Sequence, residues 1–259
     1  MNGTRQPVSR RLQGKPRATG RAPVMLVVRR RGVSVTFILN ILHRDMSILA
    51  ADRKAIKGLP NTAAPDMPVH AGDRSIVRDY NKITLNSSKS LALGIAGNTQ
   101  DHYYIQGIAL SASIDDAIWK IRKHQEGFLR IYDRASLNTL TSFMVNQGVA
   151  SFFDQEASTY FTNAFRFSPI ESWTRLYRGR EDVQIIHAGS GSDYFIEAVG
   201  SENINAFGAS VRNSCTPEAC ILWMRDAYMK VAGSDSGSGA EAAFVVSTRS
   251  NPQFNVIEA

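Results

Sequence analysis

The order of the predicted elements indicates an α+β fold and not a chain of repeated β-α-β units. A β-rich hairpin occupies residues 36–51, and helical segments follow at 114–132 and 139–146. A further helix is predicted at 217–231, with a strand after it at 242–247. Strands therefore come in groups separated by helices, which is typical of layered α+β proteins.

The charge of the chain is unevenly distributed. Residues 1–35 contain nine basic residues and no acidic one, whereas residues 36–259 contain 21 basic and 23 acidic residues. The first segment is also rich in Gly, Pro and Ser and has no hydrophobic period, so we expect a basic disordered leader before one domain at 36–259. The leader alone is a weak, non-specific signal for nucleic acid, and it also fits an organelle transit peptide.

The first half of the domain reads as strands and turns. Residues 36–42 and 46–51 are predicted to pair as a hairpin. Residues 58–75 contain three prolines and two glycines and are predicted to form a loop. Residues 83–85 and 91–96 are expected to form a second strand pair.

Two helices carry recognisable end signals. Ser113 is expected to cap the helix at 114–132, whose apolar residues line one side. Thr216 is expected to cap the helix at 217–231, and Gly233 is expected to follow its end.

The segment between the helices is predicted to contain short strands at 183–187, 194–198 and 204–207. The Gly189–Ser192 run has phosphate-loop composition, but we expect no helix after it and interpret it as a hairpin turn.

Composition excludes several classes. No apolar run approaches the ~18 residues of a membrane-spanning helix, so a soluble protein is expected. Cys215 and Cys220 are spaced neither as a zinc pair nor as a redox pair, and a reducing cytoplasm is the simplest compartment. None of the five histidines has metal-ligand spacing, so no metal or organic cofactor is expected.

Five short features occur in a fixed order along the domain. Thr36 begins the first strand, and Asp52 follows the second within Ala-Ala-Asp-Arg. Lys82 precedes an apolar residue, and Gly97 ends Gly-Ile-Ala-Gly. The run Asp-Ser-Gly-Ser-Gly at 235–239 precedes the last predicted strand.

This combination resembles the β-type proteasome family and its bacterial HslV-type relatives over about residues 36–247. The resemblance implies a four-layer α/β/β/α sandwich of the N-terminal-nucleophile hydrolase type. It also implies a threonine-type endopeptidase that degrades peptides or unfolded proteins inside a homo-oligomeric ring, with an ATP-driven unfoldase as a possible partner. No membrane or nucleic-acid partner is expected.

The resemblance implies a catalytic role for three of these residues. Thr36 would be the nucleophile, and its own free α-amine would act as the base. Lys82, held close and charged, would enlarge the neutral fraction of that amine. Asp52 is the natural partner for a buried Lys82.

Further roles follow from the same resemblance. The N–H of Gly97 would donate to the oxyanion, an interaction worth roughly 3 kcal/mol. Asp235 and Ser238 would orient Thr36. The residues expected to line the substrate pocket are Ala55, Ile95 and Thr99.

The sequence departs from the family pattern in three places. A serine expected after Gly208 is Ala209, and the segment between Asp52 and Lys82 is long. Val35 stands where self-processing relatives have glycine. While the leader is attached, the Thr36 nitrogen is a peptide N–H and the chain is expected to be inactive. Removal as a propeptide is one route to the amine, and initiation at Val35 is the one we favour.

Three other functions remain open from the sequence. One is a non-catalytic ring subunit on the same fold, and another is an amidase acting on small amides. A third is nucleic-acid binding by the basic leader. Thr36 taken alone also fits an ordinary strand threonine, and Asp52 with Lys82 fits a structural ion pair.

Overall fold

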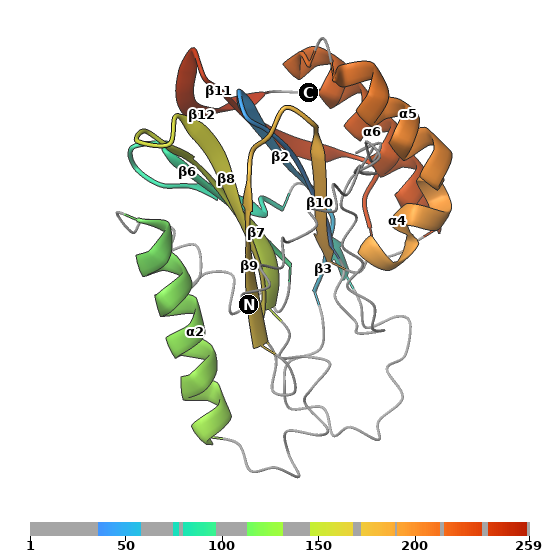
Figure 1. The fold of residues 1–259 in the computed structure, drawn as a ribbon. Helices are drawn as coiled ribbons and strands as arrows, with labels where there is room; N and C mark the ends of the chain where they lie inside the picture. Colours follow the sequence, from blue (N-terminus) through green and yellow to red (C-terminus); the bar gives the residue numbers. More distant parts are fainter. Residues whose placement is uncertain are drawn as a thin grey trace, which may run out of the picture.

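A computed structural model gives the fold of the chain (Figure 1). The described residues are 36–57, 75–77, 80–96, 113–131, 146–167, 172–189, 191–212, 215–234 and 238–257. Within them the protein is a mixed α+β structure with two five-stranded antiparallel sheets and a two-stranded ribbon.

The first sheet contains both ends of the described chain. Its strand order is β10 (Gln184–Gly189), β1 (Phe37–His43), β2 (Met46–Asp52), β11 (Ala242–Thr248) and β12 (Asn251–Ile257).

The second sheet follows the order of the sequence. It consists of β5 (Ile83–Leu85), β6 (Leu91–Ala96), β7 (Asn146–Asp154), β8 (Thr159–Phe167) and β9 (Ser172–Arg178). Beside these sheets, β3 (Ala55–Lys57) and β4 (Ser75–Val77) form the two-stranded ribbon.

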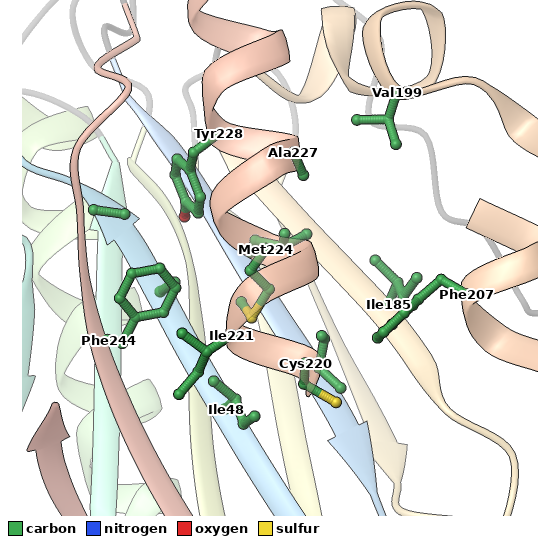
Figure 2. Packing of buried hydrophobic residues seen from close by; sticks show 14 of the residues in the cluster. Ile48, Ile185, Val199, Phe207, Cys220, Ile221, Met224, Ala227, Tyr228 and Phe244 are labelled. Atoms are coloured by element: carbon green, nitrogen blue, oxygen red, sulfur yellow. The ribbon is translucent and has the colours of Figure 1, made fainter. Parts of the chain in front are cut away.

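Within the described ranges, four helices pack against the sheets. The helices α4 (Ser192–Val199), α5 (Ser201–Val211) and α6 (Pro217–Ser234) share one apolar cluster with the first sheet (Figure 2). The helix α2 (Ile114–Ile131) contributes Ala117 to a separate cluster with the second sheet. Figure 1 shows α2 on the opposite side of the molecule from the other three. No helix within the described ranges is long and apolar enough to cross a membrane.

The predicted hairpin at the start of the domain is confirmed. β1 and β2 pair antiparallel from Ile38–Ala51 to His43–Met46, with Arg44 and Asp45 in the turn. Every residue of both strands is buried, because β1 and β2 are central in their sheet and are covered on both faces. That double coverage explains why these strands read as nearly continuous apolar runs.

Alternation along β1 divides the core in two. Phe37, Leu39 and Ile41 belong to the cluster with α4, α5 and α6. Ile38 and Leu42 belong to a second cluster that contains residues of both five-stranded sheets. Because successive strand residues point to opposite faces, one strand supplies side chains to both cores.

A buried polar network lies within the core between the two sheets. Asn40 of β1 donates to the Ser47 hydroxyl of β2 at 2.9 Å, and Ser47 and Ser151 of β7 share a hydrogen bond of 2.7 Å. Thr162 of β8 donates to the Asn40 side-chain oxygen at 2.9 Å. All four side chains are fully buried. Their hydrogen bonds satisfy polar groups that would otherwise be costly to bury.

The predicted caps of two helices are present. Ser113 Oγ accepts from the Asp116 amide at 3.2 Å, and Thr216 Oγ1 accepts from the Ala219 amide at 3.3 Å. α6 differs from its predicted end, because it continues through Gly233 to Ser234.

Two predicted strands are wrong. Residues 194–198 lie in α4, and residues 204–207 lie in α5. The buried residues of α5 are Ile204, Phe207 and Val211, which follow helical spacing. A window of four or five residues is too short to reveal that spacing, so the apolar runs were assigned to strands.

Other differences concern elements that the sequence analysis did not predict. No strand was predicted for the residues of β7, β8 and β9, and none was predicted after 242–247, where β12 follows β11. The predicted strand pair at 83–85 and 91–96 is confirmed as β5 and β6. The predicted loop lies outside the described residues apart from 75, and the predicted helix at 139–146 does so apart from Asn146, which begins β7.

Candidate active site

Thr36 lies immediately before β1, at the end of the first sheet where β2 also ends. It is 2% exposed. Its carbonyl oxygen accepts a hydrogen bond from the Gly191 amide at 3.3 Å. The start of β1 is therefore fixed from the side of α4, which begins one residue after Gly191.

Gly189 makes this approach possible. It pairs with Phe37 and has a φ of 97°, a conformation that favours glycine. A Cβ at this position would overlap the Thr36 carbonyl oxygen. Gly189 ends β10, Gly191 directly precedes α4, and both contact the Thr36 carbonyl, so the expectation of a hairpin turn with no helix after it was wrong.

The carboxylate of Asp52 is the centre of the site. Asp52 ends β2 and is fully buried. Its Oδ1 accepts from the Phe37 amide at 2.7 Å and from Lys82 Nζ at 2.9 Å. Its Oδ2 accepts from the Gly239 amide at 3.1 Å. The carboxylate thereby joins the residue after Thr36, the second sheet and the segment before β11.

The electrostatics of Asp52 reflect opposing influences. Burial is the largest influence and holds the pKa of its carboxyl above the ordinary value, although the cation of Lys82 and the amides of Phe37 and Gly239 act to lower that pKa. All three partners are N–H donors, so the bonded oxygens act only as acceptors. That pattern suits the ionised carboxylate.

Lys82 is held from the second sheet. It immediately precedes β5, and its carbonyl accepts from the Ile95 amide of β6 at 3.1 Å. Its side chain is almost completely buried in a salt bridge with Asp52. Lys82 Nζ and the Phe37 amide bond the same oxygen, so the ammonium lies within two hydrogen-bond lengths of the Phe37 backbone. A fixed positive charge thus stands close to the start of β1.

The segment before β11 closes the site. Ser238 is buried, and Gly239 comes close enough that a Cβ would lie 2.9 Å from Lys54 Cβ and 3.5 Å from Asp52 Oδ2. The amide of Arg53 donates to the Glu241 carbonyl at 3.0 Å, which fixes this segment beside the end of β2.

The remaining predicted residues have different outcomes. Gly97, Thr99 and Asp235 lie outside the described residues. Ala55 begins β3. Ile95 is buried with Leu91, Leu93 and the Ala117 side chain of α2, on the face of β6 opposite to Ala96.

Ala209 does not lie where the family resemblance places the expected serine. In that family the serine follows a strand glycine, whereas Gly208 and Ala209 lie in the helix α5. Ala209 is exposed, on the side of α5 away from the buried residues Ile204, Phe207 and Val211. The apparent departure at Ala209 therefore concerns a helix residue and not the site.

Two contacts of the site were not predicted from the sequence. One is the contact of Gly189 and Gly191 with Thr36, which the Gly-Ser-Gly-Ser run after a strand could have indicated. The other is Tyr228 of α6, whose hydroxyl donates to the Phe37 carbonyl at 3.2 Å. In the sequence, Tyr228 cannot be distinguished from the other residues on the apolar face of this helix.

The site contains charged groups but no described metal centre. Over the ranges that the structure describes, no three His, Cys, Asp or Glu side chains are grouped to hold a metal ion. No protein-family model matches the chain, and no curated protein matches it either.

Proposed function

We propose that the protein is a threonine-type peptide hydrolase in which Thr36 attacks the peptide carbonyl once its α-amine is free. The observation that carries the proposal is the buried Asp52–Lys82 pair, bonded to the amide that directly follows Thr36. A buried ion pair is weak evidence for stability alone. Its position at a strand-initial threonine supports a catalytic purpose.

The chemistry follows from the neighbours of Thr36. A free amine at Thr36 takes the proton from its own hydroxyl, and Oγ1 then attacks the carbonyl carbon. The cation of Lys82 favours the neutral form of that amine. The proton passes to the departing amine of the peptide, which leaves an ester on Thr36. Water then hydrolyses the ester and restores the hydroxyl.

The oxyanion that forms during attack needs donors. The N–H of Gly97 is proposed for this role on the resemblance described above. Asp235 and Ser238 are proposed to orient Thr36, and the burial of Ser238 next to Gly239 is compatible with that role.

We further propose that the layered arrangement is the four-layer α/β/β/α sandwich of N-terminal-nucleophile hydrolases. The apolar core shared by the two five-stranded sheets supports this proposal. So do the separate clusters that α4, α5 and α6 make with one sheet and α2 makes with the other. A cytoplasmic homo-oligomeric ring fed by an ATP-driven unfoldase is the assembly that such a fold suggests.

The test compares chains that differ at Thr36. A chain beginning at Thr36 should hydrolyse fluorogenic peptide amides, whereas the full chain with residues 1–35 should not. Thr36→Ala in the shortened chain should reduce kcat/KM by at least about a thousandfold. Thr248→Ala is the matched control, since Thr248 lies at the far end of β11 and its loss should leave the rate unchanged.

The alternatives give different results. A shortened chain that folds but cleaves neither peptides nor small acyl-amides would overturn the enzyme and favour a non-catalytic ring subunit. Hydrolysis of acyl-amides without hydrolysis of peptides would indicate an amidase. Intact mass and N-terminal sequence of the protein from its native host should reveal a chain starting at Thr36.

A further inference from the structure

The two cysteines of the chain lie together at the start of α6. Cys215 and Cys220 have their Sγ atoms 3.7 Å apart, within hydrogen-bond distance for sulfur. Their spacing of five residues in the sequence does not match a redox pair. The turn into the helix brings them into contact.

The backbone holds this arrangement in place. The Cys220 amide donates to the Thr216 carbonyl at 3.2 Å, which forms the first turn of α6. The Thr216 hydroxyl caps the same turn through the Ala219 amide. Cys215 precedes the cap, so its side chain folds back over the turn that carries Cys220.

The two thiols differ in environment. Cys220 is fully buried in the apolar cluster below α6, beside Ile221 and Met224 (Figure 2). Cys215 is only partly buried against the same cluster. The hydrogen bond between the thiols lowers the pKa of Cys215 and raises that of Cys220. Cys215 also lies at a helix N-terminus, where partial positive charge favours a thiolate.

Cys215 lines a cavity. A cavity of about 520 Å³ is lined by Cys215, Asp45 and Arg249 among others, and Cys220 is not one of its lining residues. The Arg249 guanidinium bonds the Asp45 carboxylate at 3.3 Å and the Ser158 hydroxyl at 2.9 Å, so the cavity has a polar wall in which both charges are paired. A small molecule entering here meets Cys215 first.

We propose that Cys215 and Cys220 form a redox modification site that reacts with small-molecule disulfides. The Cys215 thiolate attacks one sulfur of the disulfide, forms a mixed disulfide and releases one small thiolate. Cys220 then gives its proton through solvent to the first released thiolate and attacks Cys215 Sγ; the second small thiolate leaves and takes the proton that Cys215 had lost to solvent. The protein is oxidised by two electrons to an internal disulfide, and the small disulfide is reduced to two thiols.

The geometry requires only a local movement. A disulfide bond is about 2.05 Å long. The two sulfurs start at 3.7 Å, a gap that side-chain rotation at Cys215 can close. Cys215 is the residue expected to move, because Cys220 is enclosed by the core.

The experiment treats the folded full-length protein with oxidised glutathione, then unfolds it in denaturant and follows intact mass together with thiol alkylation. The wild type should lose both alkylatable thiols and gain no glutathione. Cys220→Ala should instead retain one glutathione on Cys215, because the resolving thiol is absent. Cys215→Ala should gain none, because Cys220 is enclosed.

Several outcomes would overturn the proposal. They are a wild type whose thiols both stay alkylatable, a wild type that keeps a glutathione adduct as Cys220→Ala does, and a disulfide that links two chains. Should Cys220→Ala fail to fold, peptide mapping of the oxidised wild type decides, since it must yield Cys215 and Cys220 in one linked fragment. The readout is independent of peptide hydrolysis.

Discussion

Asp52 and His187 are both buried in the first sheet near the start of β1, but their surroundings are opposite. Asp52 bonds three N–H donors, one of them the ammonium of Lys82. His187 of β10 packs against the Phe195 ring at 4.9 Å between centroids. Within the described part of the chain, neither of its ring nitrogens has a hydrogen-bond partner.

The comparison of Asp52 with His187 shows that a buried group keeps its charge only where polar partners surround it. Burial acts against the charged form of both side chains. At Asp52 a cation and two amides oppose that effect. At His187 nothing does, and burial lowers its pKa to about 4. The same region of the sheet thus holds one charged and one neutral group.

Removal of the partner of Asp52 is expected to have the largest effect. Lys82→Met keeps the length of the side chain but leaves a buried carboxylate without its cation. We expect the free energy of unfolding at pH 7 to fall by about 3–5 kcal/mol, measured by urea denaturation.

Lys230→Met is the matched control for this change. Lys230 pairs with Asp226 at 2.7 Å, a shorter distance than in the buried pair, but both side chains are partly exposed. Its removal should cost no more than about 0.5 kcal/mol. Equal losses of unfolding free energy in Lys82→Met and Lys230→Met would show that burial of the ion pair is not what makes Lys82 important.

The second largest effect is expected from acid, because protonation of buried His187 should lower the free energy of unfolding. The folded pKa is about 4 and the ordinary value is 6.5, so the unfolded chain binds the proton more readily. The stability that depends on neutral His187 is complete above pH 6.5 and is lost as the pH falls towards 4, by about 3 kcal/mol in total.

The variant His187→Leu isolates this contribution. Urea denaturation of both proteins from pH 4 to pH 8 should show that the wild type loses more unfolding free energy than the variant as the pH falls. A difference between the two proteins that stays constant over this range would exclude the titration of His187.

The smallest effect is expected for an uncharged partner of the same strand. Tyr228→Phe removes the hydroxyl that donates to the Phe37 carbonyl and keeps the ring packing. The expected loss is about 0.5–1.5 kcal/mol, independent of pH between 5 and 8 because burial raises the pKa of this hydroxyl. A loss as large as that of Lys82→Met would mean that charge is not the decisive property.

Local signals predicted some elements well. The β-rich runs on either side of Arg44 and Asp45 specified the first hairpin, and Ser113 and Thr216 marked the starts of α2 and α6. These features depend on neighbours in sequence. The pairing of Asp52 with Lys82 was anticipated from a family resemblance and from the need of a buried lysine for a partner.

Features that depend on distant packing were missed. The helix α5 was assigned to a strand because only its contact with α6 and the first sheet explains the burial of Ile204 and Phe207. The positive φ of Gly189 is explained only by the Thr36 carbonyl that lies beside it in the fold. Likewise, five residues of separation did not reveal the contact between Cys215 and Cys220.

The buried network of Asn40, Ser47, Ser151 and Thr162 has a consequence for the alignment of the two sheets. Apolar side chains tolerate sliding, because one methyl contact replaces another at little cost. Hydrogen bonds between buried groups do not, since a shift leaves donors unpaired. The network therefore fixes the position of the strands β1 and β2 of the first sheet relative to the strands β7 and β8 of the second sheet. It sets the offset at which the end of β2 meets the start of β5, so that Asp52 reaches Lys82.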